Sequence, residues 1–485
     1  MESSLQKIRK NFSYLFVAEI AIRAMMLILT IYLAQRYSPE KLGIYALALS
    51  VGNLFEIIFN MGLGIVFLQR VSAHWEKAEE ELSHFLPLRM VLSLLSFASL
   101  VIMALLLNKN AETFASIVLA GLHYSLLSLA VFLWAIFDAR QKMAYTATAK
   151  LMIYPLIFVL GLYFISVQMP IWSILGTFVI GIIISLIFTI TIIQKNFCRI
   201  KLNFNTKKWS EIIREGWPIA LAGTFVFVYN YLDTIIISIT KNEAAVGLYH
   251  AGYKITGTIF ILANLVNQAY FPPLVKAKDK ANGELKEIFT RALGTALFWS
   301  IPITLGGILL ADRIILFIYG PAYAGSITAF KILMTNCIIF FLSSAMINFM
   351  YSLGKQKKVI KIFFAGALAN TVCNIFVIPI WGIEGAATTT MLAELIVLFG
   401  IFFLVKKNIT FSIARIGWKS GAGGIVMAAA LWYIQFESLI LTIAFGALVY
   451  FAACGLLSRA HLKAGLVSLK PARRIREESL PKENP

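Results

Sequence analysis

Charged residues are scarce in this sequence, and their scarcity excludes a water-soluble domain. Asp, Glu, Lys and Arg make up 14% of the 485 residues, whereas 59% are apolar and the mean hydropathy is +0.81. Soluble domains carry about 25% charged and about 45–50% apolar residues. The hydrocarbon core of a bilayer accepts this excess of apolar side chains, provided that helices satisfy the backbone. We therefore predict an all-α polytopic membrane protein.

The residues that several kinds of active site require are also missing. The four cysteines form no Cys-x-x-Cys pair, and the five histidines are scattered without metal-ligand spacing. No Gly-rich phosphate loop followed by Lys and Ser or Thr occurs in the sequence. We expect no metal, no cofactor and no catalytic activity, so an ion gradient, the membrane potential or product removal must drive any transport.

Apolar runs of roughly 20 residues, the length that crosses a bilayer, predict about fourteen transmembrane spans. The expected spans are 12–33, 43–68, 86–107, 115–137, 146–167, 171–193, 217–239, 247–271, 292–310, 324–350, 362–378, 384–405, 420–434 and 438–457. Of the 43 Lys and Arg residues, with those at span ends counted with the nearer face, 35 fall on the side of the N-terminus, six on the other side and two in span interiors. Because basic residues mark the cytoplasmic side, we expect both termini in the cytoplasm of a cell-membrane protein. The net charge of +19 then belongs to this cytoplasmic face and indicates no nucleic-acid partner.

Two sequence motifs recur in the same order in the two halves of the chain. LGIYALAL, which starts at Leu42, aligns with VGLYHAGY, which starts at Val246, at an offset of 204. PIWSILG (170–176) aligns with PIWGIEG (379–385) at an offset of 209. Both offsets cross six spans, so we expect two six-helix lobes in a parallel pseudo-twofold repeat with a cleft between them. The expected divisions are 1–200 and 201–410 for the two lobes, 411–458 for two extra transmembrane helices and 459–485 for a basic cytoplasmic tail.

Three stretches of the chain resemble the Wzx-type polysaccharide flippases of the multidrug/oligosaccharidyl-lipid/polysaccharide (MOP) superfamily. Residues 33–50 are similar to the first outer loop and second helix of that family, and residues 214–238 and 246–254 to its seventh and eighth helices. The similar features are a Gly-x-Pro entry, an Asp before an Ile run and a Gly-Leu-Tyr-x-Ala-x-Tyr-Lys segment.

This resemblance implies a flippase that moves a polyprenyl-(pyro)phosphate-linked oligosaccharide from the inner to the outer leaflet by alternating access, for surface polysaccharide biosynthesis. The polar head would pass through the cleft while the prenyl tail stays among the membrane lipids. We expect the protein to act as a monomer.

Six charged residues are assigned to the interior of the predicted spans, where each costs about 2.5–3.5 kcal/mol on insertion scales. They are Glu19, Arg23, Glu56, Asp233, Lys254 and Glu394. Because a guanidinium suits phosphate oxygens, we predict that Arg23 and Lys254 bind the anionic head group. The alternative for each is a structural ion pair, of Arg23 with Glu19 one turn earlier and of Lys254 with Asp233.

Polar residues also recur along one face of the second span, at Asn53, Glu56 and Asn60. Such a stripe must face protein or water. We predict that Glu56 pairs with Arg23 or serves as a proton or sodium site, the alternative being an interhelical hydrogen-bond cluster. The further candidates for coupling-ion or polar cleft residues are Asn53, Asn60, Asp233, Glu19 and Glu394.

The sum of the charges within the spans favours a competing function. Four acids and two bases give a net charge of −2, whereas a pyrophosphate site should be positive. A cation-coupled multidrug or metabolite antiporter of the same fold is therefore the second hypothesis, unless Arg89, Lys150 and Arg291 turn into the cleft from the inner span ends. A membrane glycan polymerase or ligase is the third, and the short outer loops argue against it.

Overall fold

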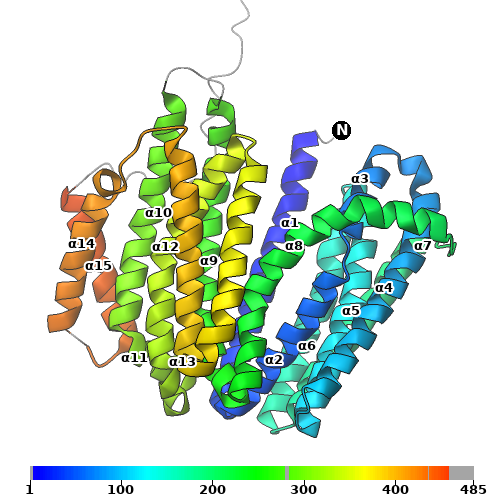
Figure 1. Ribbon diagram of the computed structural model, residues 1–485, viewed down its shortest axis with the longest axis horizontal. Helices are drawn as coiled ribbons and strands as arrows, with labels where there is room; N and C mark the ends of the chain where they lie inside the picture. The colour runs from blue at the N-terminus through cyan, green and yellow to red at the C-terminus, as the bar shows by residue number, and fades with distance from the viewer. Residues whose placement is uncertain (1–3, 279–282, 435, 458–485) are drawn as a thin grey trace, which may run out of the picture. The chain divides into compact units, whose positions relative to one another are not determined.

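The computed structural model describes residues 4–278, 283–434 and 436–457, which form helices joined by short connections, with no strand among them (Figure 1). The long helices are α1 (Ser4–Arg36), α2 (Pro39–Ile58), α4 (Ala78–Leu106), α5 (Ala111–Ala139), α6 (Met143–Ser166), α7 (Ile171–Asn196), α8 (Thr206–Thr240), α9 (Glu243–Ala277), α10 (Glu284–Leu309), α12 (Ile327–Ser352), α13 (Gln356–Lys406), α14 (Ile413–Tyr433) and α15 (Leu439–Leu457). The short elements are α3 (Leu63–Ala73), α11 (Ala311–Tyr319) and the 3-10 turns η1 (Trp75–Lys77) and η2 (Pro321–Ser326).

Ten of the described helices are long and apolar enough to cross a membrane. The longest, α13 with 51 residues, is two helices that meet at a kink at Gly382 (φ 61°, ψ −133°), so it supplies two spans. α2, α8 and α14 have 20, 35 and 21 residues, each long enough for about 30 Å of hydrocarbon. With these included, the described chain has about fourteen helical segments of membrane-spanning length, and the predicted multi-pass helical architecture is confirmed.

The second predicted span, 43–68, is broken in two. α2 ends at Ile58 and α3 begins at Leu63, after Met61 and Gly62, which both have left-handed backbone (φ 50° and 64°). A left-handed residue interrupts the helical hydrogen-bond ladder. The interruption leaves backbone carbonyl groups at the end of α2 accessible to side-chain donors.

The chain divides into two compact units, of which unit 1 comprises residues 1–251, 318–325 and 367–386. Within unit 1, α5 packs against α2, α4 and α7, and α6 packs against α1 and α7. α8 packs against α2, α3 and α4, and its green ribbon curves along these helices in Figure 1. Unit 1 therefore contains the helices of the first predicted lobe together with α8, although the repeat places α8 in the second lobe.

Unit 2 comprises the described residues within 252–317, 326–366 and 387–457. In it, α10 packs against α12 and α14, and α14 packs against α15. The hydroxyl of Tyr450 on α15 donates to the carbonyl oxygen of Phe298 on α10 at 2.8 Å, and both residues are buried. The two helices outside the repeat are thus part of the core of unit 2.

The repeat predicted at an offset of 204 is visible where α2 meets the first turns of α9, within unit 1. Gly43 lies against the carbonyl oxygen of Glu243, and Gly247 lies against that of Pro39, so closely that a Cβ atom on either glycine would overlap the oxygen. Glu243 and Gly247 are the repeat equivalents of Pro39 and Gly43. The contact is therefore reciprocal, as contacts across a twofold axis are, and it agrees with the predicted pseudo-twofold repeat.

Large apolar side chains on the outward faces of the helices agree with a lipid environment. Leu94, Val159 and Ile187 are 67%, 62% and 62% exposed. Extensive apolar surface of this kind would associate in water, but in a bilayer it contacts lipid chains at no such cost.

Candidate functional site

Three charged side chains from α1 and α6 meet in unit 1, and we call Glu19, Arg23 and Lys150 the α1–α6 cluster. Arg23 Nε lies 3.2 Å from Glu19 Oε1, and Lys150 Nζ lies 3.5 Å from Glu19 Oε2. The packing of α6 along α1 brings Lys150 beside an acid and a base that one helical turn already places together. One carboxylate thus bridges two cations, which leaves the cluster with an excess of positive charge.

The side chains of the α1–α6 cluster remain accessible. Arg23 is 56% exposed, Glu19 42% and Lys150 30%. Nε is the guanidinium nitrogen through which Arg23 contacts the described residues. The two terminal nitrogens of Arg23 are therefore available to a further anion, in the fork geometry that matches phosphate oxygens.

Glu56 pairs with Arg89 of α4 rather than with Arg23. Arg89 Nη2 donates to Glu56 Oε1 at 3.0 Å, and Asn60 Nδ2 donates to the same oxygen at 3.0 Å. Arg89 Nη1 donates to the carbonyl oxygens of Asn60 (3.1 Å) and Phe59 (3.3 Å), where α2 is interrupted. Arg89 is 3% exposed and Glu56 14%, so both charges are largely withdrawn from solvent. The guanidinium lies at the C-terminal end of α2, where the helix dipole favours a positive charge.

The polar residues predicted on one face of the second span form hydrogen bonds with two different helices. Asn53 Nδ2 donates to the hydroxyl of Tyr231 on α8 at 3.0 Å, whereas the Glu56 carboxylate is held from α4. Both interactions join α2 to another helix of unit 1, which is how polar side chains within a bilayer are accommodated.

Asp233 on α8 is buried, with 2% of its surface exposed. Its Oδ2 accepts a hydrogen bond from the hydroxyl of Tyr249 at 2.6 Å, and its Oδ1 accepts from the amide and hydroxyl of Thr234 at 2.6 Å and 3.3 Å. Neutral donors of unit 1 therefore surround this carboxylate. Lys254 belongs to unit 2, and its predicted pair with Asp233 stays a prediction.

Unit 2 holds the remaining predicted residues. Lys254 is half-buried on α9, and Glu394 is 8% exposed on the second half of α13. Arg291 at the start of α10 is 67% exposed and pairs with Glu287 one turn earlier at 2.5 Å. The charge of Arg291 is thus neutralised at an exposed helix face.

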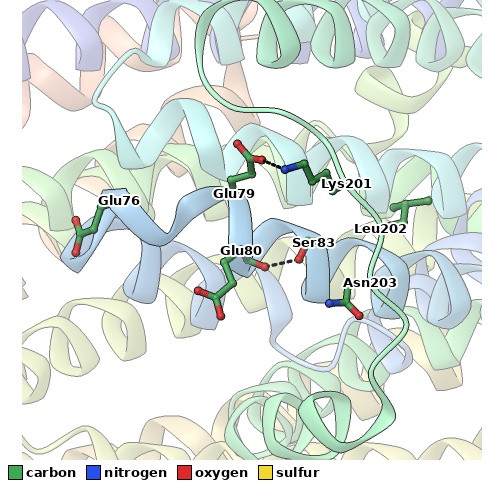
Figure 2. A pocket seen from close by; sticks show the side chains of 7 residues that line it. All are labelled: Glu76, Glu79, Glu80, Ser83, Lys201, Leu202 and Asn203. Atoms are coloured by element: carbon green, nitrogen blue, oxygen red, sulfur yellow. Dashed lines mark hydrogen bonds and ion pairs between the residues drawn. The ribbon is translucent and has the colours of Figure 1, made fainter.

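A hollow of about 570 Å³ lies where the chain leaves α7 and passes the start of α4 (Figure 2). Its lining residues are Glu76, Glu79, Glu80, Ser83, Lys201, Leu202 and Asn203. Lys201 Nζ lies 2.6 Å from Glu79 Oε1, and the amide of Asn203 donates to the carbonyl oxygen of Ser83 at 2.9 Å. The hollow contains none of the predicted site residues, and its contacts fasten the connection between α7 and α8 to α4.

The structure therefore brings Glu19 together with Arg23, and Glu56 together with Asn60. It also shows that each of these two pairs contacts a cation from another helix. Lys150 joins the first pair and Arg89 joins the second. Both lie near the inner ends of predicted spans, a position that the sequence reveals, but their partners lie on other helices.

These features define a multi-pass helical membrane protein that keeps charged networks within its spans. A family profile described as "Polysaccharide biosynthesis protein" matches residues 8–278, which is more than half of the chain. The chain belongs to this polysaccharide biosynthesis protein family.

Similar proteins extend this result. "Probable flippase AglR" of Haloferax volcanii is 27% identical over 170 residues, which are 34% of this chain, and the chain spans only 35% of the length of that relative. The structure titled "Lipid II flippase MurJ, inward closed conformation" has a TM-score of 0.77 at 18% identity, over 92% of this chain and 99% of that one. An inward-facing multidrug resistance MATE family transporter of the MOP superfamily has a TM-score of 0.63 at 13% identity, over 83% and 99% of the two chains. The fold is thus that of MOP superfamily transporters.

Proposed function

We propose that this protein is a flippase that moves a polyprenyl-(pyro)phosphate-linked oligosaccharide from the inner to the outer leaflet of the cell membrane. It serves surface polysaccharide biosynthesis as a monomer with both termini in the cytoplasm, and it works by alternating access between two six-helix lobes. The family of the chain and the flippase names of AglR and MurJ support this function.

The α1–α6 cluster is the observation that carries the proposal. In it, two cations share one carboxylate, and all three side chains are accessible. Arg23 would receive the phosphate oxygens in its guanidinium fork, and Lys150 would add a second positive charge. Lys254 is the residue that we propose to complete the site from the second lobe.

Glu19 would help the α1–α6 cluster to release the head group after transport. Its carboxylate neutralises part of the charge of Arg23 and Lys150 between transport events, since it lies within 3.2 Å and 3.5 Å of them. A pyrophosphate head group carries more negative charge than a single carboxylate and competes for the same cations. Because Glu19 is tethered one turn from Arg23, it can replace the head group when the lipid leaves.

We propose Asp233 and Glu394 as the first candidates for a proton or sodium site, because both carboxyl groups are buried. For Glu56 to take up an ion, its pair with Arg89 must first open. Uptake at Glu56 would therefore require movement at the interruption of α2, where Asn60 and Arg89 meet it.

Binding of a prenyl pyrophosphate to the purified protein in detergent tests the anion site. Arg23→Gln should weaken binding about tenfold or more, because a hydrogen bond to a charged group contributes about 1.5–3 kcal/mol. Lys150→Gln should weaken it less, because its ammonium contacts the anion as a point charge. Glu19→Gln should strengthen binding, because it removes the competing carboxylate.

The pair of Lys331 and Asp312 in unit 2 provides the matched control, since it is also an accessible cation and carboxylate, 3.2 Å apart. Lys331→Gln and Asp312→Asn should leave binding unchanged. The same variants are then assayed for surface polysaccharide in a host whose own flippase is deleted. Unchanged binding and unchanged export in Arg23→Gln would refute the proposed site.

A cation-coupled antiporter is the second candidate, because the MATE family transporter shares the fold and Asp233 and Glu394 are buried acids. Expression that raises drug tolerance without affecting surface glycan would favour this function over the flippase.

A further inference from the structure

We propose that two latches hold α8 and the start of α9 on the first six-helix repeat, one at each membrane face, and that each face opens by release of its own latch. This deepens the proposed function, because alternating access is part of it. The outer latch comprises the contact of Gly43 with Gly247 and the ion pair of Lys109 with Glu243. The inner latch comprises the contact of Gly62 with Gly216 and the ion pair of Arg70 with Glu215.

The outer latch combines a backbone contact with an ion pair. A Cβ atom on Gly247 would lie 3.0 Å from the amide nitrogen of Gly43, and one on Gly43 would lie 2.9 Å from that of Gly247. Lys109 Nζ lies 2.9 Å from Glu243 Oε1 and donates to the carbonyl oxygen of Ser238 at 2.7 Å. Lys109 is 18% exposed and Glu243 14%, so salt screens the pair little. The end of α8 and the start of α9 are thereby held on α2 and on the connection between α4 and α5.

The inner latch has the same two parts. A Cβ atom on Gly62 would lie 2.6 Å from the carbonyl oxygen of Gly216, and one on Gly216 would overlap that of Met61. The left-handed backbone of Gly62 (φ 64°) makes this approach possible at the interruption of the second span. Arg70 on α3 pairs with Glu215, the residue before Gly216. The start of α8 is thereby held on α3.

The two latches lie at opposite ends of one long helix. Glu215 and Ser238 are roughly 35 Å apart at the rise of an α-helix, which exceeds the thickness of the hydrocarbon core. Both latches are closed in this structure, where α8 curves along α2 and α3 (Figure 1). A transporter that opens to one face at a time passes through such a state between its two open states.

A contact between the latches supplies the pivot. Asn53 on α2 donates to the hydroxyl of Tyr231 on α8 at 3.0 Å. Because Tyr231 lies between Glu215 and Ser238 along α8, tilting the helix about this point would lift one end from the first repeat while the other end stays in contact. Glycine at the contact positions lets the backbones approach closely, so that each latch closes without rearranging side chains.

Ser50 provides a reporter between the latches. It is 5% exposed and lies two turns after Gly43, on the same face of α2. Ser50→Cys in a full chain without its native cysteines should react slowly with a membrane-impermeant maleimide from either side of oriented vesicles. Gly247→Ala should accelerate the reaction about tenfold at one face, and Gly216→Ala about tenfold at the opposite face, because each shifts the population toward one open state.

Gly64→Ala is the matched control, because a Cβ atom there would meet nothing within 4 Å, and it should leave both rates unchanged. The ion pair gives a test that involves no glycine. Lys109→Glu should open the same face as Gly247→Ala. Adding Glu243→Lys restores an opposite-charge pair and should return the slow reaction.

The labelling reports the position of α8 whether or not the protein carries a lipid-linked sugar. The latch proposal can therefore be refuted while the flippase function is supported, and the flippase function can be refuted while the latch proposal is supported. Acceleration at opposite faces, together with recovery in the charge-exchanged pair, supports the two latches. Unchanged rates, acceleration of both variants at the same face, or absence of recovery would overturn them.

Discussion

Replacing Arg89 with methionine should destabilise the protein by about 3–5 kcal/mol, the usual cost of removing one partner of a buried ion pair. Glu56, at 14% exposed, would lose the cation that lies 3.0 Å from it. The carbonyl oxygens of Phe59 and Asn60 would each lose a donor. Asn60 Nδ2 would still donate to Glu56 Oε1 at 3.0 Å, which favours the lower end of this range.

Removing both charges should cost much less than removing one. Apolar residues of similar volume often replace a buried ion pair at little or no cost, so Glu56→Met combined with Arg89→Met should recover most of the stability. The coupling energy of the double-mutant cycle should then be about 2 kcal/mol or more, within the range found for residues in direct contact. Glu56→Gln should be intermediate, because glutamine keeps an oxygen that accepts from Asn60 and Arg89.

Unfolding by SDS in mixed dodecylmaltoside micelles, followed by tryptophan fluorescence, measures these differences. Arg291→Met is the control, since Arg291 and Glu287 are 67% and 62% exposed and such surface pairs contribute about 0–1 kcal/mol. The reasoning is refuted if Arg89→Met costs no more than Arg291→Met. It is equally refuted if the double variant loses the sum of the two single losses.

Three further predictions concern the connections between helices. Burial, reinforced by the negative charge of Glu79, raises the pKa of the Cys198 thiol to about 11. Maleimide labelling of this residue should therefore be slow at pH 7 and accelerate toward pH 11. Labelling at the rate of free cysteine at pH 7 would contradict this prediction. Asn205→Ala should cost about 1 kcal/mol in the SDS titration, because the side-chain oxygen of Asn205 caps α8. Arg313→Ala should increase proteolysis between α14 and α15, where the guanidinium donates to two backbone carbonyl oxygens at 2.6 Å and 2.7 Å; an unchanged digestion rate would mean that these bonds do not hold the connection.

The number and order of the helices could be predicted from the sequence because bilayer thickness sets the length of every apolar run. The kink at Gly382 separates two predicted spans, 362–378 and 384–405, as their hydropathy indicated. The interruption at Met61 and Gly62 could not be predicted in this way, because both residues lie inside one apolar run. The structure places Gly62 against the backbone of Gly216, a tertiary contact that the hydropathy of the run does not reveal.

The same distinction applies to the candidate site. Glu19 and Arg23 are four residues apart, so helix geometry alone brings them together, and the structure shows the contact. The partners Lys150 and Arg89 come from α6 and α4, and no spacing rule connects residues on separate helices. Hydropathy showed which charges lie in the membrane, whereas only the packing of the helices shows which of them neutralise each other.

The cations added by the structure also change the charge argument between the two candidate functions. The six residues assigned to the interior of the predicted spans sum to −2, which favoured a cation exporter, but Lys150 and Arg89 at the inner span ends offset that deficit. Exposure then separates their roles: Arg89 is 3% exposed and committed to Glu56, whereas Arg23 is 56% exposed and shares one carboxylate with Lys150. A ligand can reach Arg23 and cannot reach Arg89 without breaking a buried pair. Among the charged span residues of unit 1, the accessible excess of positive charge therefore lies on α1 and α6, where an anionic head group rather than a cation would be attracted.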